Sequence, residues 1–346
     1  MGNKDNWLSV VGYTVAAIGI AGICYYLIRS MQKQDGSQDD GNVESKPDID
    51  SWKGERVSDP PKWLELEPTD ESDPCKHVVQ EALDSDAWWL TAASRRGKSH
   101  AHKGHWREDA YCLGFANGWS LISVSDGAGS AKLSRVGAKI ASRAAIEQLS
   151  TSLSGTTDDA EDLVAPIDAL RLAVHKAHEA LVAEAESRKA SIKDFACTLL
   201  IVAHRQLASG ESVIAHLLIG DGAVFIKYCG NDESTAVPIV LESGDHGISA
   251  GETTFLTSRA AEEWDARATY TKDARPLDFL LVLSDGVADD FMPFDKYPKL
   301  LTESIAPQVL SYPRDEHPAK LQELIAYEKR GSFDDRTAVL LSRLNS

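Results

Sequence analysis

The chain has 346 residues, of which 43% are hydrophobic, so its length and composition suit one large globular domain or two small ones. Its 36 Lys and Arg residues face 53 Asp and Glu residues, which gives a formal charge of −17. This acidic balance argues against non-specific binding of nucleic acid, because phosphate backbones attract basic surfaces.

The N-terminal segment from Trp7 to Ile28, WLSVVGYTVAAIGIAGICYYLI, is apolar and contains no charged residue. As a helix it would span about 33 Å, which is enough for the hydrocarbon core of a bilayer. A cleaved signal peptide would need a shorter apolar run and a small-x-small cleavage site, and a buried core helix rarely precedes a polar, acidic tail. We therefore expect one transmembrane helix within an N-terminal segment of residues 1–30.

The charges that flank this segment predict its orientation. Arg29 and Lys33 follow it closely, whereas only Lys4 precedes it. The positive-inside tendency then places the large C-terminal part in the cytoplasm. Five cysteines, an odd number without a CxxC pair, also favour a reducing compartment. We expect a single-pass protein of the inner (cytoplasmic) membrane, with its main domain in the cytoplasm.

Residues 31–62 are rich in Gln, Asp, Gly, Ser, Lys and Pro and contain few large apolar side chains. Such a stretch cannot bury enough surface to offset its ordering entropy, so we expect an acidic, flexible linker. The remaining chain, residues 63–346, is then the folded domain. Near its start, residues 74–88 (PCKHVVQEALDSDAW) read as a short amphipathic helix.

From Trp88 onward, strand-like and helix-like segments are interleaved. Short Val-, Ile- and Leu-rich runs that close with Gly, Asp or a charged residue predict strands. These runs are WSLISVSDG (119–127), ACTLLIVAHR (196–205), SVIAHLLIGD (212–221), AVFIKYCG (223–230), FLLVLSDG (279–286) and TAVLLSRL (337–344). Apolar residues at helical spacing predict two long helices, 134–149 and 166–188, and a shorter one over 318–330. This inventory fits a layered α+β architecture better than a strict βαβ alternation.

Three aspartates stand at the ends of predicted strands. Asp126 follows one apolar run in LISVSDGAGSA, Asp285 follows another in FLLVLSDGVADD, and Asp334 precedes a third in GSFDDRTAVLL. A carboxylate beside a buried strand costs desolvation energy unless it is paired or bound to a cation. One such Asp is more often a turn residue, but the repeated context and the acids at 108–109 favour a shared site. Oxygen-only ligands suit Mg²⁺ or Mn²⁺ better than zinc.

Together with these acids, seven motifs resemble the metal-dependent type 2C Ser/Thr protein phosphatase family, in the bacterial branch that begins with a Gly-Lys-Ser-His stretch. They occur in the family's order between about residue 92 and residue 344. The motifs are GKSHAHKGHWREDAY (97–111), VSDGAGSAKLSRVGAKIAS (124–142), DFACTLLIVA (194–203), LLIGDGAVFI (217–226), GETTFLTS (251–258), LVLSDGVADD (281–290) and GSFDDRTAVLL (331–341). The resemblance implies two antiparallel β-sheets packed as a sandwich and flanked by helix pairs, here preceded by one transmembrane helix.

The resemblance also implies a cleft with two divalent ions, Mn²⁺ or Mg²⁺, and a weaker third one in some members. Asp126 would bridge the two ions, and the carbonyl of Gly127 would bind one of them. Asp285 and Asp334 would hold the other ion, while Asp289 matches the position that supports the third.

Two further acids complete the site that the resemblance implies: Asp109 and Glu108 would orient metal-bound waters. The expected reaction is hydrolysis of phosphoserine and phosphothreonine on proteins by a water that the two metals activate. Phosphorylated proteins are then the partners, together with the membrane through residues 7–28, and no nucleic acid is expected. The oligomeric state stays open. The alternatives are a catalytically weak pseudophosphatase acting as a tethered binding module, and an acidic Ca²⁺-binding domain.

The sequence departs from the family at two positions. Gly104 stands where many members place a phosphate-binding Arg, and Arg96, Lys98, Lys103 and Arg107 are the candidates to replace it. Ala128 stands where eukaryotic members have a His proposed as general acid, so that role would fall to a metal-bound water or to another residue such as His100. A zinc site built on His100, His102 and His105 would lack a fourth partner nearby.

Overall fold

A computed structural model describes residues 63–85, 87–155, 164–230, 236–240, 253–291 and 304–344. All of these belong to the unit Ile49–Ser346. The predicted transmembrane segment 7–28 and the predicted linker 31–62 lie outside the described residues. Within the part of the chain that is described, no helix combines the length and apolar character needed to cross a membrane.

Eleven described strands form two antiparallel sheets, as the family resemblance implies. The six-stranded sheet has the order β1-β2-β11-β10-β7-β8, and the five-stranded sheet has the order β3-β4-β5-β6-β9. The strands of the first sheet are β1 (Val78–Asp84), β2 (Trp88–Arg95), β11 (Arg336–Arg343), β10 (Leu277–Leu283), β7 (Ala223–Tyr228) and β8 (Ala236–Val240). Those of the second are β3 (Ala110–Ala116), β4 (Trp119–Ser125), β5 (Leu199–Gln206), β6 (Ser212–Ile219) and β9 (Thr269–Asp273).

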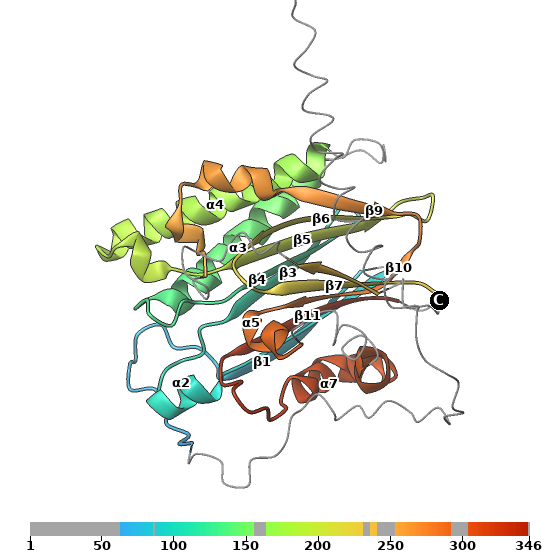
Figure 1. Ribbon diagram of the computed structural model, residues 1–346. Coiled ribbons are helices and arrows are strands. Elements are labelled where there is room, and N and C mark those ends of the chain that lie inside the picture. Colours follow the sequence, from blue (N-terminus) through green and yellow to red (C-terminus); the bar gives the residue numbers. More distant parts are fainter. Residues whose placement is uncertain are drawn as a thin grey trace, which may run out of the picture. The chain divides into compact units, whose positions relative to one another are not determined.

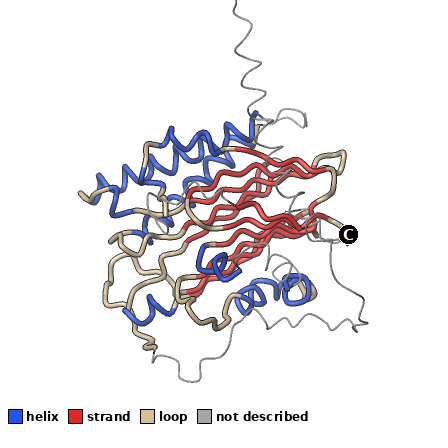
Figure 2. The backbone as a smooth tube through the Cα atoms, viewed as in Figure 1, coloured by secondary structure: helices blue, strands red, loops and turns tan. Residues whose placement is uncertain are grey.

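The two sheets pack face to face, with helices on both outer faces (Figures 1 and 2). Two long helices, α3 (Ser134–Leu153) and α4 (Val164–Arg188), cover the five-stranded sheet, while α5 (Asp285–Ala288) and α7 (His317–Leu324) pack on the six-stranded one. Each interface between layers has its own apolar cluster. The α+β sandwich of the sequence prediction is therefore confirmed for the described residues.

β4 illustrates why the central strands read as continuous apolar runs. All seven of its residues are buried, because one face meets the helices and the other meets the second sheet. Leu121 faces α3, whereas Ile122 and Val124 face the inter-sheet core. A strand that is covered on both faces loses the polar alternation of a half-exposed strand.

The helix α3 packs closely against the segment that precedes β5 because a glycine lies on its inner face. A Cβ atom at Gly137 would lie 2.2 Å from the carbonyl oxygen of Phe195, so only glycine fits there. The sequence predicts this helix over 134–149, and it continues to Leu153. The second long helix, predicted over 166–188, begins slightly earlier at Val164.

Two sequence predictions about local structure are wrong. Residues 74–88 are not a helix, because Val78–Asp84 forms β1, the edge strand that pairs with β2. Its side chains are mostly exposed, so they lack the alternation that marks a half-buried strand. The helix predicted over 318–330 is shorter, since α7 ends at Leu324.

Several elements carried too little pattern to be predicted at all. The strands β2, β3 and β9 and the short helix α2 (Lys98–Lys103) are the main examples. The segment α2 sits inside the motif 97–111 and ends at Gly104, whose φ of 65° is in the left-handed region. Gly104 therefore ends a helix in this chain, which gives the residue a structural role.

Candidate functional site

The predicted acidic residues meet at one edge of the two sheets. Asp126 directly follows β4, and Asp109 directly precedes β3, whose first residue Ala110 pairs with Ser125. Asp285 follows the end of β10, and Asp334 lies just before β11, where Leu283 pairs with Ala338. The antiparallel connections thus bring acids from distant parts of the sequence to the same edge.

The electrostatics of Asp126 show how tightly these carboxyl groups are clustered. Burial, followed by repulsion from Asp285 and from Asp109, raises its pKa well above the ordinary value. Asp334 adds a further repulsion. Groups that shift one another in this way lie within mutual reach, as a shared cation site requires.

A network of hydroxyl groups holds Asp109 in place. Its Oδ2 accepts hydrogen bonds from Ser284 Oγ at 2.8 Å and from Thr337 Oγ1 at 2.6 Å. The other oxygen, Oδ1, is buried without a donor group among the described residues that would bond to it, and the Asp109 carboxyl lies against that of Asp126. Burial and the negative charge of Asp335 raise the pKa of Asp109 to about 6. An oriented carboxylate with one unpartnered buried oxygen is suited to a cation or to an ordered water.

Ser284 and Thr337 were not predicted from the sequence as site residues. Each of them directly neighbours or closely follows a predicted acid, because Ser284 precedes Asp285 and Thr337 lies in the DDRT segment. Thr337 N–H also donates to Ser284 Oγ at 3.0 Å, which joins β11 to the end of β10. The serine of the repeated SDG pattern was the available signal.

Asp285 lies at the start of α5 and is surrounded by other acids. Burial and then repulsion from Asp221 and Asp109 raise its pKa well above the ordinary value. Asp221, which belongs to the motif 217–226, was assigned no role from the sequence. Partial burial of the Asp289 carboxyl, followed by repulsion from Asp221, raises its pKa to about 6, although the residue as a whole is exposed. The structure therefore places Asp289 beside Asp221, at the outer side of the cluster.

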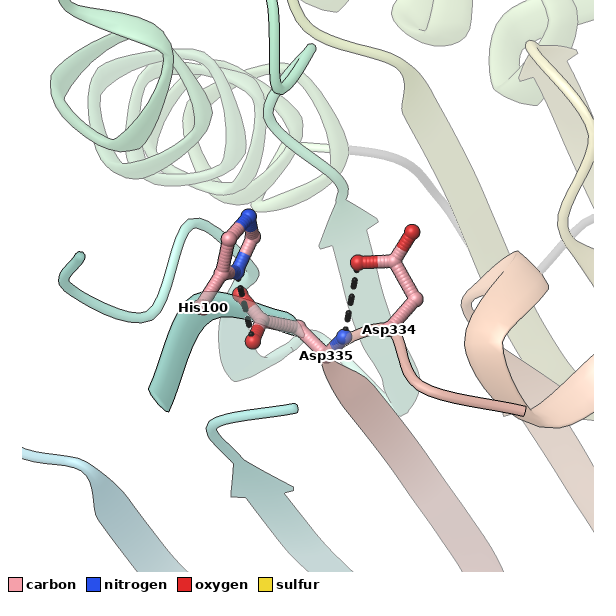
Figure 3. Close-up of side chains that lie close together, drawn as sticks. All are labelled: His100, Asp334 and Asp335. Carbon is pink, nitrogen blue, oxygen red and sulfur yellow. Dashed lines mark hydrogen bonds and ion pairs between the residues drawn. The ribbon is translucent and has the colours of Figure 1, made fainter. Parts of the chain in front are cut away.

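The two acids of the DDRT segment have different surroundings (Figure 3). Asp334 is exposed, and its Oδ1 accepts a hydrogen bond only from its neighbour's backbone N–H, at 2.8 Å. Asp335 is 1% exposed and accepts hydrogen bonds from the backbone N–H groups of Gly97 at 2.6 Å and of Glu108 at 2.5 Å. Its Oδ1 also lies 2.9 Å from His100 Nδ1. Asp334 thus keeps free oxygens for a ligand, whereas the oxygens of Asp335 are already occupied.

His100 and Glu108 both contact Asp335, His100 through its ring and Glu108 through its backbone N–H. Burial opposes protonation of His100, but the close contact with Asp335 and the charge of Asp335 raise its pKa to about 9. Burial raises the pKa of Glu108 to about 7 against the opposing charge of His100. Glu108 Oε2 is buried without a hydrogen-bond partner in the described part of the chain.

Gly127 brings the backbone of the loop after β4 into close contact with its neighbours. A Cβ atom there would lie 2.9 Å from Ser134 and 3.0 Å from the carbonyl oxygen of Glu108. The residue also forms an isolated antiparallel bridge with Cys197. The close approach explains why glycine follows Asp126, and the predicted role of its carbonyl as a metal ligand stays a prediction.

The structure separates the four basic residues that were considered as replacements for the missing Arg. Arg96 is buried and contacts Glu65 at 2.6 Å and the carbonyl oxygen of His105 at 3.2 Å. Arg107 is also buried, and it donates to Ser94 Oγ and to the carbonyl oxygen of Asp109. Both arginines therefore stabilise the loops around the site.

The two lysines have different positions. Lys98 forms an ion pair with Glu328 and, with Asp334, lines a small cavity of about 40 Å³. Lys103 is exposed at the end of α2. Among the described residues, neither lysine forms an ion pair with Asp126, Asp285 or Asp334.

Comparison with known proteins gives this geometry a family context. Residues 96–326 match the sequence profile described as Protein phosphatase 2C. Serine/threonine-protein phosphatase 3 of Escherichia coli (strain K12) is 29% identical to the chain over 182 residues. That alignment covers 51% of this chain and 65% of the relative, so the chain spans less than two thirds of the relative's length.

Two solved structures share the fold at low sequence identity. The serine-threonine phosphatase 2C from Toxoplasma gondii has a TM-score of 0.50 at 14% identity, covering 78% of this chain and 100% of that chain. A phosphatase from a pathogenic strain of Toxoplasma gondii has a TM-score of 0.50 at 13% identity, covering 78% and 96% of the two chains. At these identities the likeness is one of fold.

Proposed function

The chain belongs to the protein phosphatase 2C family, and from this premise we propose that it removes phosphate from phosphoserine and phosphothreonine side chains of proteins. One observation carries the proposal: Asp126, Asp285, Asp334 and Asp109 converge at one edge of the sandwich, where burial and mutual repulsion raise their pKa values. Carboxylates that repel one another in this way are stabilised by cations.

The donor set fits hard divalent ions. Carboxylate oxygens are the ligands that Mg²⁺ and Mn²⁺ prefer, and the unpartnered Oδ1 of Asp109 adds an oriented oxygen beside them. We infer that Asp126, Asp285 and Asp334, with the carbonyl of Gly127, would hold two such ions, and that Asp289 would support a weaker third. Bound ions would neutralise the phosphate dianion and make water a better nucleophile.

The chain's own residues would keep this arrangement rigid. Ser284 and Thr337 fix the carboxylate of Asp109 through two short hydrogen bonds, so its free oxygen faces a defined direction. Asp335 ties the backbone of Gly97 and Glu108 to the start of β11. Because both sets of contacts join loops from distant parts of the chain, they would hold the reacting groups within the tolerance that catalysis needs.

We further infer that water attacks the phosphorus directly, without a phosphoenzyme. The groups that converge on the site are carboxylates, and the nearby hydroxyl of Ser284 is already donated to Asp109. Hydrolysis in ¹⁸O-labelled water with single-turnover trapping tests this point. A covalently phosphorylated protein during turnover would overturn direct attack.

The activity itself is tested with the full chain in detergent. Release of phosphate from a phosphothreonine peptide and from p-nitrophenyl phosphate should depend on Mn²⁺ or Mg²⁺. Asp285→Asn should abolish it while the circular-dichroism spectrum is unchanged, because the amide keeps the shape and loses the ligand charge. A wild-type protein that is folded but inactive with either metal would favour the alternative of a binding module without turnover.

We also propose that residues 7–28 anchor this domain at the cytoplasmic membrane, which would raise the effective concentration of substrates there. The support is the uncharged apolar sequence of that segment and the basic residues that follow it. Membrane fractionation of cells that express the full chain and a form lacking residues 1–30 tests the anchor. Recovery of both forms in the soluble fraction would overturn it.

A further inference from the structure

Two arginines stand directly opposite each other where β2 and β11 pair. Arg95 is the last residue of β2, and Arg336 is its partner in the register. Both lie on the sheet face that α7 covers, because Ala93 and Ala338, two residues away on each strand, belong to the apolar cluster on that face. Like charges directly opposite each other destabilise a sheet, so an anion bound by both would offset the repulsion.

The side chain of Arg336 is buried and only partly satisfied. One terminal nitrogen, Nη1, donates to the carbonyl oxygens of Ile325 at 3.1 Å and of Tyr327 at 2.6 Å. The other, Nη2, donates to Ser332 Oγ at 2.7 Å and lies 3.7 Å from Asp290 Oδ2. The remaining Nε is buried without a hydrogen-bond partner among the described residues. A buried N–H group that lacks a partner indicates a bound water or ion.

Arg95 has no committed acceptor. Its side chain is half-buried, and among the described residues it forms no ion pair and no side-chain hydrogen bond. Burial and the charge of Arg336 lower the pKa of Arg95, while Glu328 and Glu65 act in the opposite direction. Both of these acids already form ion pairs with other basic residues. The guanidinium of Arg95 is therefore available to an external acceptor.

The two arginines share a cavity of about 40 Å³. This volume holds about three water molecules, which is roughly the space of a tetrahedral oxyanion. Arg96 Nε is, like Arg336 Nε, buried without a hydrogen-bond partner in the described part of the chain. The lining includes four basic side chains and two acidic ones: Arg95, Arg96, Lys98, Arg336, Glu328 and Asp334.

We propose that this cavity binds a phosphate group, held by the guanidinium of Arg95 and by the unpartnered Nε–H of Arg336. A guanidinium can donate two parallel N–H bonds to a phosphate, which makes arginine the side chain best suited to this ligand. The choice of phosphate among oxyanions rests on the proposed phosphatase function, which releases it as product. The group could be free phosphate or a second phosphorylated side chain of the substrate protein.

The proposed site lies on the other face of the six-stranded sheet from Asp109. Thr337, the neighbour of Arg336 on β11, points toward Asp109, and successive side chains of a strand point to opposite faces. The cavity adjoins the acidic cluster only through Asp334. A phosphate held there would therefore occupy a second position, next to the one where the substrate is hydrolysed.

The test uses the full chain in detergent and EDTA, with inorganic phosphate as the probe. Without metal the carboxylates around Asp126 repel phosphate, so phosphate that binds under these conditions binds elsewhere. We expect isothermal titration calorimetry in excess chloride to show phosphate binding, and Arg95→Met to weaken its Kd by about tenfold or more. Arg95→Lys keeps the charge and loses the paired donors, so its Kd should be intermediate.

Two results would overturn the site: no binding of phosphate by the wild type, or equally tight binding by Arg95→Met. The matched control is Arg143→Met, because Arg143 is exposed on α3 and pairs with Glu147. Its phosphate Kd should equal that of the wild type. If Arg143→Met weakens binding as much as Arg95→Met, only the net charge matters and the proposal is wrong.

Thermal unfolding without phosphate gives an independent reading. Arg95→Met removes a charge that Arg336 repels, so its Tm in EDTA should equal or exceed that of the wild type. A Tm lower by several degrees would show that Arg95 is already paired within the fold and would contradict the proposal. Added phosphate should raise the Tm of the wild type more than that of the variant.

Turnover with Mg²⁺ distinguishes the two sources of the phosphate group. Peptides with one phosphothreonine are compared with peptides that carry an additional phosphoserine. If a second phosphorylated side chain occupies the cavity, the wild type prefers the doubly phosphorylated peptides by kcat/KM, and Arg95→Met loses this preference. If free phosphate is the ligand, the wild type and Arg95→Met show the same ratio of kcat/KM values.

The same preparations separate this proposal from the proposed function. An inactive wild type whose phosphate binding in EDTA depends on Arg95 would contradict the phosphatase assignment and leave the site intact. An active wild type without such binding would retain the phosphatase assignment and refute the site. We expect an active wild type, with unchanged turnover of p-nitrophenyl phosphate in Arg95→Met, because Arg95 lies outside the acidic cluster.

Discussion

The two ends of the core between the sheets bury ionisable groups in opposite ways. At one end, three other carboxyl groups cluster around that of Asp126, and the pKa values of all four are raised. At the other end, His204 is completely buried against the ring of Trp88, and burial and the charge of Arg343 lower its pKa to about 3. β5 runs between the two regions, because Thr198, just before this strand, binds Asp126 N–H and His204 lies near the strand's end.

Burial favours the neutral form of both kinds of group, but the consequences differ. A single imidazole becomes neutral by losing one proton, and His204 then needs no counterion. Several carboxyl groups in one place repel one another as soon as more than one is ionised, so their cluster is stabilised by a cation. Convergence of like charges therefore indicates function, whereas burial alone does not.

Asp126→Asn is the most direct way to break the acidic cluster. It removes the charge that Asp285 and Asp109 repel, so the metal-free protein should be as stable as the wild type or more stable. Phosphatase activity should fall by about a thousandfold or more, because a ligand is lost. The measurements are p-nitrophenyl phosphate turnover and the Tm in EDTA.

The contrast between the acidic cluster and His204 is contradicted if Asp126→Asn keeps most of its phosphatase activity. Asp126 would then be a buried acid without a ligand role, equivalent to His204 at the other end of the core. A large drop of the Tm in EDTA would also contradict it, since the wild-type carboxyl would have to be stabilising in the absence of metal.

Thr337→Val tests whether the acids must be held as well as brought together. The hydroxyl of Thr337 donates to Asp109 at 2.6 Å, and valine removes this donor at nearly constant volume. We expect activity to fall by about 10- to 100-fold, the usual effect of losing a group that orients a metal site. Circular dichroism should show an unchanged fold.

Thr91→Val is the matched control on the same sheet. Thr91 is buried on β2, next to β11, and its hydroxyl has no hydrogen-bond partner among the described residues. Its loss should leave turnover unchanged and stabilise the protein slightly. Equal loss of activity in both variants would mean that any buried threonine of this sheet matters, and the specific role of Thr337 would be refuted.

Most of the fold could be predicted because its central strands and long helices carry strong patterns. β4 and β10 are covered on both faces and read as apolar runs, and each ends in SDG at the site. β1 was misread as a helix because an exposed edge strand has no face to mark. Its existence depends on pairing with β2, which is a tertiary contact.

The candidate site was predictable at the level of single acids and not at the level of contacts. Asp334 and Asp335 are adjacent and chemically identical, and only the structure shows that Asp335 accepts hydrogen bonds from Gly97, which is 238 residues away in the chain. The pairing of His100 with Asp335 has the same origin. Sequence spacing cannot reveal a partner that long-range folding brings into contact.

Metal removal should have a pH-dependent effect on stability. The folded-state pKa of Asp109 is raised to about 6 from 3.8, so the metal-free folded state binds more protons than the unfolded state between these values. Stability in EDTA should therefore fall as pH rises through this window and stay low above it. Bound Mg²⁺ stabilises the ionised forms, so the increase of Tm by Mg²⁺ should be several degrees larger at about pH 7.5 than at about pH 5.

The reference for this measurement is the difference between samples with Mg²⁺ and with EDTA at each pH. Groups remote from the acids, such as His204, contribute equally to both samples and cancel. An increase of Tm by Mg²⁺ that is independent of pH would mean that the acids do not exchange protons for a cation. In Asp126→Asn one of the interacting carboxyl groups is removed, so the increase of Tm by Mg²⁺ should vary less with pH than in the wild type.

His204→Leu addresses the opposite end of the core and should have the smallest effect. Both ring nitrogens are buried without hydrogen-bond partners among the described residues, so an apolar side chain of similar size should be tolerated at neutral pH. The folded-state pKa of His204 is lowered, so wild-type stability is full above the unfolded value of about 6.5 and declines as pH falls below it. The variant lacks this decline, and its Tm should exceed that of the wild type by about 3 °C near pH 5.5.

Phosphatase activity of His204→Leu at neutral pH should be unchanged. A loss of activity would show that the two ends of the core are coupled. A variant whose stability still declines at acid pH as the wild type's does would show that His204 is not the group that resists protonation.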